Sequence, residues 1–297
     1  MSPNNPLANK GEGLSARRKF IVPARDLSLS LGERTQIMGI VNTTDDSFSG
    51  DGRLRAHQAV SYAQKLIRDG ADIIDVGGES TRPGAKRISV EEELKRVIPV
   101  IKNLAPKVNI PISVDTYKPL VAQQALEAGA SLVNNIMGSK LNKSLLKMVK
   151  NYDAAIVLMH ISGTPQTMQR KIKYNNLVKN ITDSLGRSIE NCLEIGIKLD
   201  KIIIDPGIGF GKTVEHNLTI LNQLDHFKVL KRPLLIGTSR KAFIGKILNK
   251  QVDHRLIGTV ASVCAAIMKG VQIVRVHDVR AVKEVVMVTD AIINESY

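Results

Sequence analysis

Residues 201–207 read Lys-Ile-Ile-Ile-Asp-Pro-Gly, a short β-branched run that ends in a polar turn. A run of this kind is typical of a parallel strand that is buried on both faces and carries its polar residues at one end. The same unit recurs along the chain after residue 35. Eight stretches fit it: 36–41, 73–76, 110–114, 132–135, 155–159, 201–204, 233–237 and 273–276.

Amphipathic stretches separate these strands. In residues 177–196, apolar side chains recur at every fourth position, which predicts a helix. Similar patterns predict helices over 56–69, 91–103, 119–128, 255–269 and 279–294. Gly70, Gly129, Gly196 and Gly270 each follow a predicted helix, where a left-handed C-cap belongs. Eight strands, each followed by a helix, predict an α/β fold of the closed (β/α)₈ or TIM barrel type, with its active site at the C-terminal ends of the strands.

Composition and charge narrow the functional classes. The 297 residues have 43% hydrophobic content and fit one barrel domain over 20–297, whereas residues 1–19 are rich in Pro, Asn, Gly and Lys and are predicted to be a disordered tail. The net charge of +14 favours an anionic small-molecule partner. The charge is spread along the chain, without interleaved aromatic residues, so we expect no nucleic-acid partner. No apolar run is long enough to span a membrane and no signal-peptide core is found, which favours a cytoplasmic enzyme.

Four hydrogen-bonding side chains follow predicted strands, at the face where barrel enzymes have their active sites. They are Asp115, Asn134, Asp205 and Lys241. Two carboxylates, an amide and an ammonium would form a cup for a flat heterocycle with a guanidine-like edge. Any one of them has a simpler interpretation, because an Asp at a strand end often caps the next helix.

Two further features lie at this predicted face. Arg275 and His277 share one side of the eighth strand and would suit a phosphate-type anion, although His277 could also be a helix-cap neighbour without a ligand. Residues 205–213 are glycine-rich but match neither a P-loop nor a dinucleotide fingerprint. They predict a flexible loop with an exposed Phe210 suited to stacking. His160, after the fifth strand, is equally compatible with a structural and a ligand-adjacent role.

Six ordered motifs resemble those of dihydropteroate synthases, from about residue 35 to the C-terminus. They lie at 37–42, 71–84, 112–116, 205–212, 239–241 and 275–278, and they include the Ser-Thr-Arg-Pro-Gly loop, Ser-Arg-Lys and Arg-Val-His-Asp. The resemblance implies condensation of a dihydropterin pyrophosphate with p-aminobenzoate by a homodimeric enzyme of folate biosynthesis, which is a sulfonamide target. A pterin-dependent methyltransferase and a non-catalytic pterin-binding protein are the alternatives. The methyltransferases share the barrel and the acidic cup but lack the last two motifs and the loop.

Carried over onto this chain, the resemblance implies a role for each matching residue. The pterin would contact Asp115, Asn134, Asp205 and Lys241, and the pyrophosphate would contact Asn42, Arg82, Arg275 and His277. The p-aminobenzoate site would comprise Phe48, Thr81, Pro83, Phe210, Ser239 and Lys241. Asn42 would also ligate Mg²⁺, with pyrophosphate and water as its other ligands. The catalytic set would be Asp46, Arg82, Lys241, Arg275 and His277, with Asp46 offsetting a transient cation.

The chain departs from the family pattern at several positions, and Gly50 shifts the acidic residue of the first loop by one. Asp45 replaces a proline of the first loop, which should loosen that loop. Ala242 stands where a serine often follows Ser-Arg-Lys, so one possible hydroxyl contact is lost. Ile161 stands where a methionine contacts the pterin.

Overall fold

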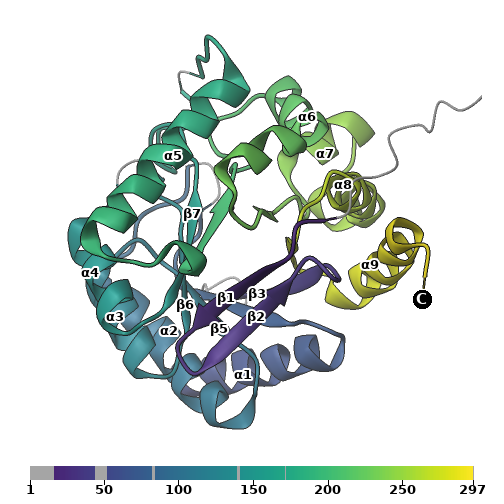
Figure 1. Ribbon diagram of the computed structural model, residues 1–297. Coiled ribbons are helices and arrows are strands. Elements are labelled where there is room, and N and C mark those ends of the chain that lie inside the picture. The colour runs from purple at the N-terminus through teal and green to yellow at the C-terminus, as the bar shows by residue number, and fades with distance from the viewer. Residues whose placement is uncertain (1–16, 44–51, 82–83, 139–140, 171, 297) are drawn as a thin grey trace, which may run out of the picture.

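Eight parallel strands form the centre of the molecule, in a computed structural model that describes residues 17–43, 52–81, 84–138, 141–170 and 172–296. The strand order is β8-β7-β6-β5-β4-β3-β10-β9, and a bridge between Ile204 and Leu234 joins the two ends of this sheet into a barrel. The predicted (β/α)₈ barrel is therefore confirmed (Figure 1). The barrel strands are β3 (Gln36–Asn42), β4 (Ile73–Gly77), β5 (Ile112–Asp115), β6 (Leu132–Asn135), β7 (Ala155–Met159), β8 (Ile202–Asp205), β9 (Leu235–Ile236) and β10 (Ile273–Val276).

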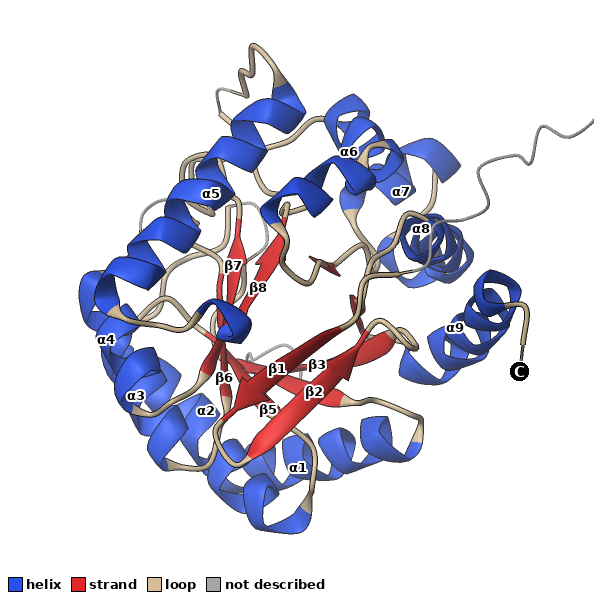
Figure 2. Cartoon of the chain, viewed as in Figure 1, coloured by secondary structure: helices blue, strands red, loops and turns tan. Residues whose placement is uncertain are grey.

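Helices cover the outside of the barrel (Figure 2). They are α1 (Gly52–Arg68), α2 (Val90–Leu104), α3 (Pro119–Glu127), α4 (Lys143–Asn151), α5 (Leu177–Ile195), α6 (Val214–Asn222), α7 (Ala242–Leu248), α8 (Leu256–Met268) and α9 (Val279–Asn294). Short 3₁₀ helices are η1 (Ala105–Lys107), η2 (Leu199–Lys201), η3 (Leu224–Leu230) and η4 (Val252–His254). The helices that the sequence predicted are present, and the four glycines expected after them have φ between 92° and 114°.

An antiparallel hairpin precedes the barrel and was not predicted. It pairs β1 (Phe20–Ala24) with β2 (Leu27–Leu31) and lies across the end of the barrel nearest the viewer in Figure 1. Its inward residues Val22, Ala24, Leu29 and Leu31 are buried against the first inward residues of the barrel strands, such as Met38 and Leu132. The hairpin thus closes the N-terminal end of the barrel with an apolar plug.

The two faces of each strand have different partners. Residues that point outward, such as Ile74, Val114 and Ile204, belong to one large apolar cluster with the helices. Residues that point inward are mostly apolar near the N-terminal ends of the strands. In several strands they become polar further along, as with Ile73 and Asp75 in β4, or Leu132 and Asn134 in β6. The barrel interior therefore changes from an apolar plug to a polar layer toward the C-terminal ends of the strands.

The described part of the chain begins at residue 17, before the predicted domain boundary at residue 20. Arg17 is buried, and its guanidinium lies 2.6 Å from the carboxylate of Asp290 in α9. Asp290 also accepts hydrogen bonds from the backbone N–H of Thr35 at 2.6 Å and from its hydroxyl at 2.8 Å. Among the described residues, no helix is both long and apolar enough to cross a membrane.

Replacing Asp290 with Ala should destabilise the fold by about 3–5 kcal/mol, because it leaves the buried Arg17 charge without its partner. The free energy of unfolding from urea titration measures the effect. Asp183→Ala is the control, since Asp183 and Lys179 form an exposed pair within α5 and such pairs contribute little. Equal losses in the two variants would contradict the role assigned to Asp290.

Candidate active site at the mouth of the barrel

Strand register brings the polar strand-end residues to one level at the mouth of the barrel. Asn42 is opposite Gly77, Gly77 is opposite Asp115, and Asp115 is opposite Asn134. Gly77 leaves room at this level, since a Cβ there would lie 3.4 Å from Cβ of Asp115 and 3.9 Å from Oδ1 of Asn42. The predicted cup is thus assembled from neighbouring strands.

A buried charge network lies directly beneath this level. The Arg275 guanidinium reaches across the interior from β10 and donates to Asp75 of β4 at 2.6 Å and to Asp115 of β5 at 2.7 Å. Asn134 donates to the same Asp75 oxygen at 3.1 Å. Asp75 is fully buried and its other oxygen has no hydrogen-bond partner within the described structure. Three strands are therefore linked through one guanidinium.

Asp205 completes the acidic side of the cup from the end of β8. Its Oδ1 accepts a hydrogen bond from the backbone N–H of Gly207 at 2.7 Å. Burial raises the pKa of Asp205 to about 6, against the opposing effects of the Gly207 N–H and of Lys241. Burial likewise raises the pKa of Asp115 to about 7, although the charge of Arg275 opposes it. Both carboxyl groups hold their protons more strongly than exposed ones do, so ligand N–H donors would favour their ionised forms.

The motifs at 239–241 and 275–278 interlock across two loops. Ser239 Oγ lies 2.9 Å from Nδ1 of His277 and accepts a hydrogen bond from the His277 backbone N–H at 3.2 Å. Arg240 turns to the other side and pairs with both carboxylate oxygens of Asp278, at 2.6 and 3.0 Å. Its positive φ of 57° lets successive residues of this motif point in different directions. Ser239 and His277 thus become one unit at the mouth.

The expected cationic pair of Arg275 and His277 differs in detail from the prediction. Both side chains are half-buried on the inner side, as alternation predicted. Arg275, however, is bonded to two carboxylates rather than left free for an anion. Burial, together with the charges of Arg275 and Arg240, lowers the pKa of His277 to about 4, so this imidazole is neutral at pH 7. Alternation predicted the side of the strand on which these two residues lie, but it did not predict their partners.

Phe210 is not exposed, which corrects the sequence prediction. Its side chain is 7% accessible and packs with Ile136, Met159, Ile161 and Met168 in a small apolar cluster at the mouth. The Lys241 ammonium lies 4.1 Å from the centre of the Phe210 ring, a cation–π contact. Burial and the nearby Arg275 charge lower the pKa of Lys241 to about 8. The ring therefore forms a wall of the cup and supports its ammonium.

The glycine-rich loop is also held more firmly than the sequence suggested. The buried Lys212 ammonium lies 3.0 Å from Nδ1 of His160 and donates to the Phe210 carbonyl at 2.9 Å. Asn217 accepts from the Gly209 N–H at 2.7 Å, and Gln169 donates to the Gly209 carbonyl at 3.1 Å. His160 therefore has a structural partner, and burial lowers its pKa to about 2.

The remaining predicted residues divide into two groups. Thr81 is half-buried in the loop after β4. Asp46, Phe48, Arg82 and Pro83 lie outside the described residues. Within the described part of the chain, no group of three or more His, Cys, Asp or Glu side chains could hold a metal ion. Asn42 offers one amide oxygen, which suits an ion such as Mg²⁺ that takes most of its ligands from pyrophosphate and water.

Sequence reasoning missed Asp75, the residue at the centre of the network. It stands within an apolar strand that reads Ile-Ile-Asp-Val-Gly, and alternation places it on the inner face of the barrel. A lone acidic residue at an interior strand position was the available signal, because a buried carboxylate requires a partner.

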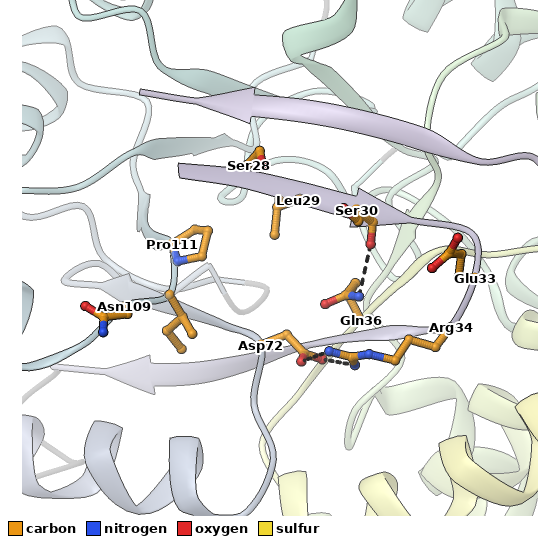
Figure 3. A pocket seen from close by; sticks show the side chains of 10 residues that line it. Ser28, Leu29, Ser30, Glu33, Arg34, Gln36, Asp72, Asn109 and Pro111 are labelled. Atoms are coloured by element: carbon orange, nitrogen blue, oxygen red, sulfur yellow. Dashed lines mark hydrogen bonds and ion pairs between the residues drawn. The ribbon is translucent and has the colours of Figure 1, made fainter. Parts of the chain in front are cut away.

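A pocket of about 420 Å³ lies at the opposite end of the barrel, where β2 faces the starts of β3 and β4. Two of its charged residues, Arg34 and Asp72, bind each other, and a third, Glu33, pairs with Lys19. Arg34 makes a two-point contact with Asp72, and Gln36 donates to the Ser30 carbonyl (Figure 3). These contacts tie the hairpin to the barrel, and they are separate from the cup at the mouth.

Comparisons with known proteins agree with this geometry. The model of the pterin binding enzyme family matches residues 38–277, from the first barrel strand to His277. Dihydropteroate synthase of Synechocystis sp. is 45% identical over 273 residues, which cover 91% of this chain and 94% of that protein. The chain belongs to the dihydropteroate synthase family of pterin-binding enzymes.

Solved structures of this family have the same fold. The Yersinia pestis dihydropteroate synthase in a sulfonamide drug complex superposes with a TM-score of 0.87 at 40% identity, covering 92% of this chain and 99% of that one. Xanthomonas albilineans dihydropteroate synthase with 4-aminobenzoic acid gives 0.85 at 36% identity, covering 93% and 98%. This pterin-binding enzyme therefore shares its fold with these relatives over most of the chain.

In this family member, Asp205→Asn should become more stable relative to the wild type as the pH rises. The folded-state pKa of about 6 is above the ordinary value of 3.8, so the contribution of Asp205 is complete below pH 4 and is lost as the pH rises through 6. An amide does not ionise, so the variant avoids this loss. The difference in urea midpoint between variant and wild type should grow from pH 4 to pH 7 and then level off.

The control is Asp183→Asn on the exposed face of α5. Its midpoint should follow that of the wild type across the same range. A pH-independent difference for Asp205→Asn would show that the carboxylate is not penalised by burial.

Proposed function

We propose that this enzyme condenses 6-hydroxymethyl-7,8-dihydropterin pyrophosphate with p-aminobenzoate, giving 7,8-dihydropteroate and pyrophosphate. The observation that carries the proposal is the union of an acidic cup, made by Asp115, Asn134 and Asp205, with the interlocked Ser239–His277 and Arg240–Asp278 pairs above it. The cup alone would suit any pterin enzyme. The interlocked pairs lie where the leaving pyrophosphate and the p-aminobenzoate would meet, and they favour the synthase over a methyltransferase.

The pterin would bind in the cup through its guanidine-like edge. Asp115 and Asp205 are acceptors for ring N–H and amino groups, and Asn134 is already oriented by its bond to Asp75. Lys241 offers donors to the carbonyl side, with Phe210 packed beneath its ammonium. Carboxylates whose pKa is raised by burial gain most from such donors, because the ligand replaces the water that they lack.

The leaving pyrophosphate would face Asn42, Arg82, Arg275 and His277. A Mg²⁺ ion carried by the pyrophosphate, with Asn42 as its protein ligand, would supply charge neutralisation of that group. An approaching anion favours the protonated form of His277, whose pKa is low in the ligand-free site because of burial and the neighbouring cations. The Arg275 guanidinium is held in place by two carboxylates, and it stays charged near pH 7.

The p-aminobenzoate would lie between Phe210, Ser239 and Lys241, with Phe48, Thr81 and Pro83 as further contacts. In the reaction, the arylamine nitrogen forms a bond to the exocyclic methylene carbon of the pterin as the carbon–oxygen bond to pyrophosphate breaks. The nitrogen then releases one proton. An arylamine is neutral at pH 7, so the protein's task is to align the reactants and to stabilise separating charges, to which Asp46 would contribute.

The activity is tested by mixing the enzyme with dihydropterin pyrophosphate, p-aminobenzoate and Mg²⁺. We expect one pyrophosphate per dihydropteroate formed, and no release when p-aminobenzoate is left out. Asp205→Asn should bind the pterin about 30- to 150-fold more weakly in calorimetry, because a charge-assisted hydrogen bond contributes about 2–3 kcal/mol. No pyrophosphate release from the wild type would refute the proposal, and wild-type affinity in the variant would refute the assignment of the cup.

We also propose that the enzyme is a homodimer whose interface includes α8 and α9, which lie side by side in Figure 1. The thirteen residues of α8 carry no charge, and its outward positions are Ile257, Ala261, Ala265 and Met268. The adjoining face of α9 exposes Met287, Val288 and Ile292, each 60–61% accessible. A helix that is apolar on all sides is expected to be buried, and a contiguous apolar surface of this kind is typical of an interface.

Ile257→Glu should convert the dimer into a monomer, because it places a charge within this apolar surface. Sedimentation velocity measures the change. Val229→Glu is the matched control, since Val229 in η3 is 68% accessible and lies outside α8 and α9. A wild-type monomer, or a variant dimer of unchanged stability, would contradict the proposed interface.

A cytoplasmic location is part of the same proposal. Cys192 and Cys264 are both free thiols, which is usual for proteins in a reducing compartment.

A further inference from the structure

The ammonium of Lys118, at the start of α3, is surrounded by acceptors. It donates to Glu79 at 2.7 Å, to Glu93 at 2.5 Å and to the carbonyl of Ile88 at 2.8 Å. The Lys118 side chain is 11% accessible, and those of Glu79 and Glu93 are 7% and 1% accessible. An ammonium has three N–H donors, so all of them are used. A fully satisfied ion cluster of this depth fixes the positions of its members closely.

Two of these acceptors belong to the two ends of one chain segment. Glu79 lies just after β4, and Ile88 lies just before α2. The Ile88 N–H also donates to Glu79 at 3.4 Å, and the Tyr117 hydroxyl donates to the other oxygen of Glu79 at 2.8 Å. The Glu79 carboxylate therefore joins both ends of the segment to each other and to Lys118.

The chain just before Glu79 has no freedom to move toward α2. A Cβ at Gly78 would lie only 2.8 Å from the Val97 side chain, and the Gly78 carbonyl accepts a hydrogen bond from Arg96 at 3.3 Å. Thr81 follows Glu79 by two residues, and Asp115 precedes Lys118 by three. The Glu79–Lys118 pair is thus a direct link between the segment of Thr81 and the strand that carries Asp115.

We propose that Glu79 is a positioning residue that holds Thr81 at a fixed distance from the pterin cup and so sets the affinity for p-aminobenzoate. The inference rests on the proposed function. Glu79 does not touch the cup, so it should leave the pterin site unaffected. Glu93 provides an internal comparison, because it binds the same ammonium from α2 and, among the described residues, its side chain has no hydrogen bond to 79–81 or 84–88.

The experiment compares Glu79→Gln with Glu93→Gln. Each variant removes one carboxylate charge from Lys118 and keeps the side-chain shape, and each should lower the thermal midpoint. Glu79→Gln should raise KM for p-aminobenzoate about tenfold, as expected for loss of one charge-assisted anchor. Its calorimetric affinity for the pterin should stay within about twofold of wild type. Glu93→Gln should leave both quantities within about twofold of wild type.

Hydrogen exchange gives a second readout that does not depend on activity. The Ile88 amide, which is bonded to Glu79, should exchange faster in Glu79→Gln than in Glu93→Gln. Equal changes of KM in the two variants, or equal exchange at Ile88, would overturn the inference. A wild type that releases no pyrophosphate would refute the proposed function, and the exchange rates would then decide by themselves whether Glu79 anchors the segment.

Discussion

The bond between the Arg275 guanidinium and the carboxylates of Asp75 and Asp115 is the constraint on which the mouth of the barrel depends. Asp75 is fully buried, and a carboxylate in that position without a cation would either take up a proton or destabilise the fold. One guanidinium satisfies two carboxylates on different strands, because its donors lie in a rigid planar fork. The positions of β4, β5 and β10 are thereby fixed relative to one another at the level where substrates would bind.

The apolar plug beneath this network strengthens the electrostatic interactions of its charged groups, because it keeps water away from one side of them. The hairpin of β1 and β2 closes the N-terminal end, where inward residues of most barrel strands, such as Met38, Ile73 and Leu132, are apolar. Water is therefore excluded from one side of the charged layer, and burial is the largest cause of the raised pKa of both Asp115 and Asp205. The same burial that penalises these carboxylates in the free protein strengthens any hydrogen bond that a ligand donates to them.

The sequence predicted the architecture because a barrel repeats its signal eight times. All eight barrel strands were identified, and the strand-end residues Asp115, Asn134 and Asp205 do lie at one mouth. The β1–β2 hairpin was missed, because its two strands are only five residues each. Their apolar residues are buried only against the end of the barrel, and no local pattern predicts that contact. The glycine-rich loop at 205–213 led to a wrong prediction for Phe210, since a loop residue can be buried by contacts that are distant in sequence, such as Lys241 and Met168.

The pairing of the buried charged residues is the part of the site that no local sequence pattern predicts. Alternation puts Arg275 on the inner face of β10, but its pairing with Asp75 joins residues that are 200 positions apart. Three carboxylates, Asp75, Asp115 and Asp205, lie close to the cations of Arg275, Lys241 and Lys212, and burial still raises the pKa of Asp115 and Asp205. A heterocycle rich in N–H donors stabilises the ionised forms of these carboxyl groups, whereas an anion would be repelled by them. The arrangement therefore favours a site in which the pterin ring supplies donors to the carboxylates, and the charges of Arg275 and Lys241 act on the leaving group.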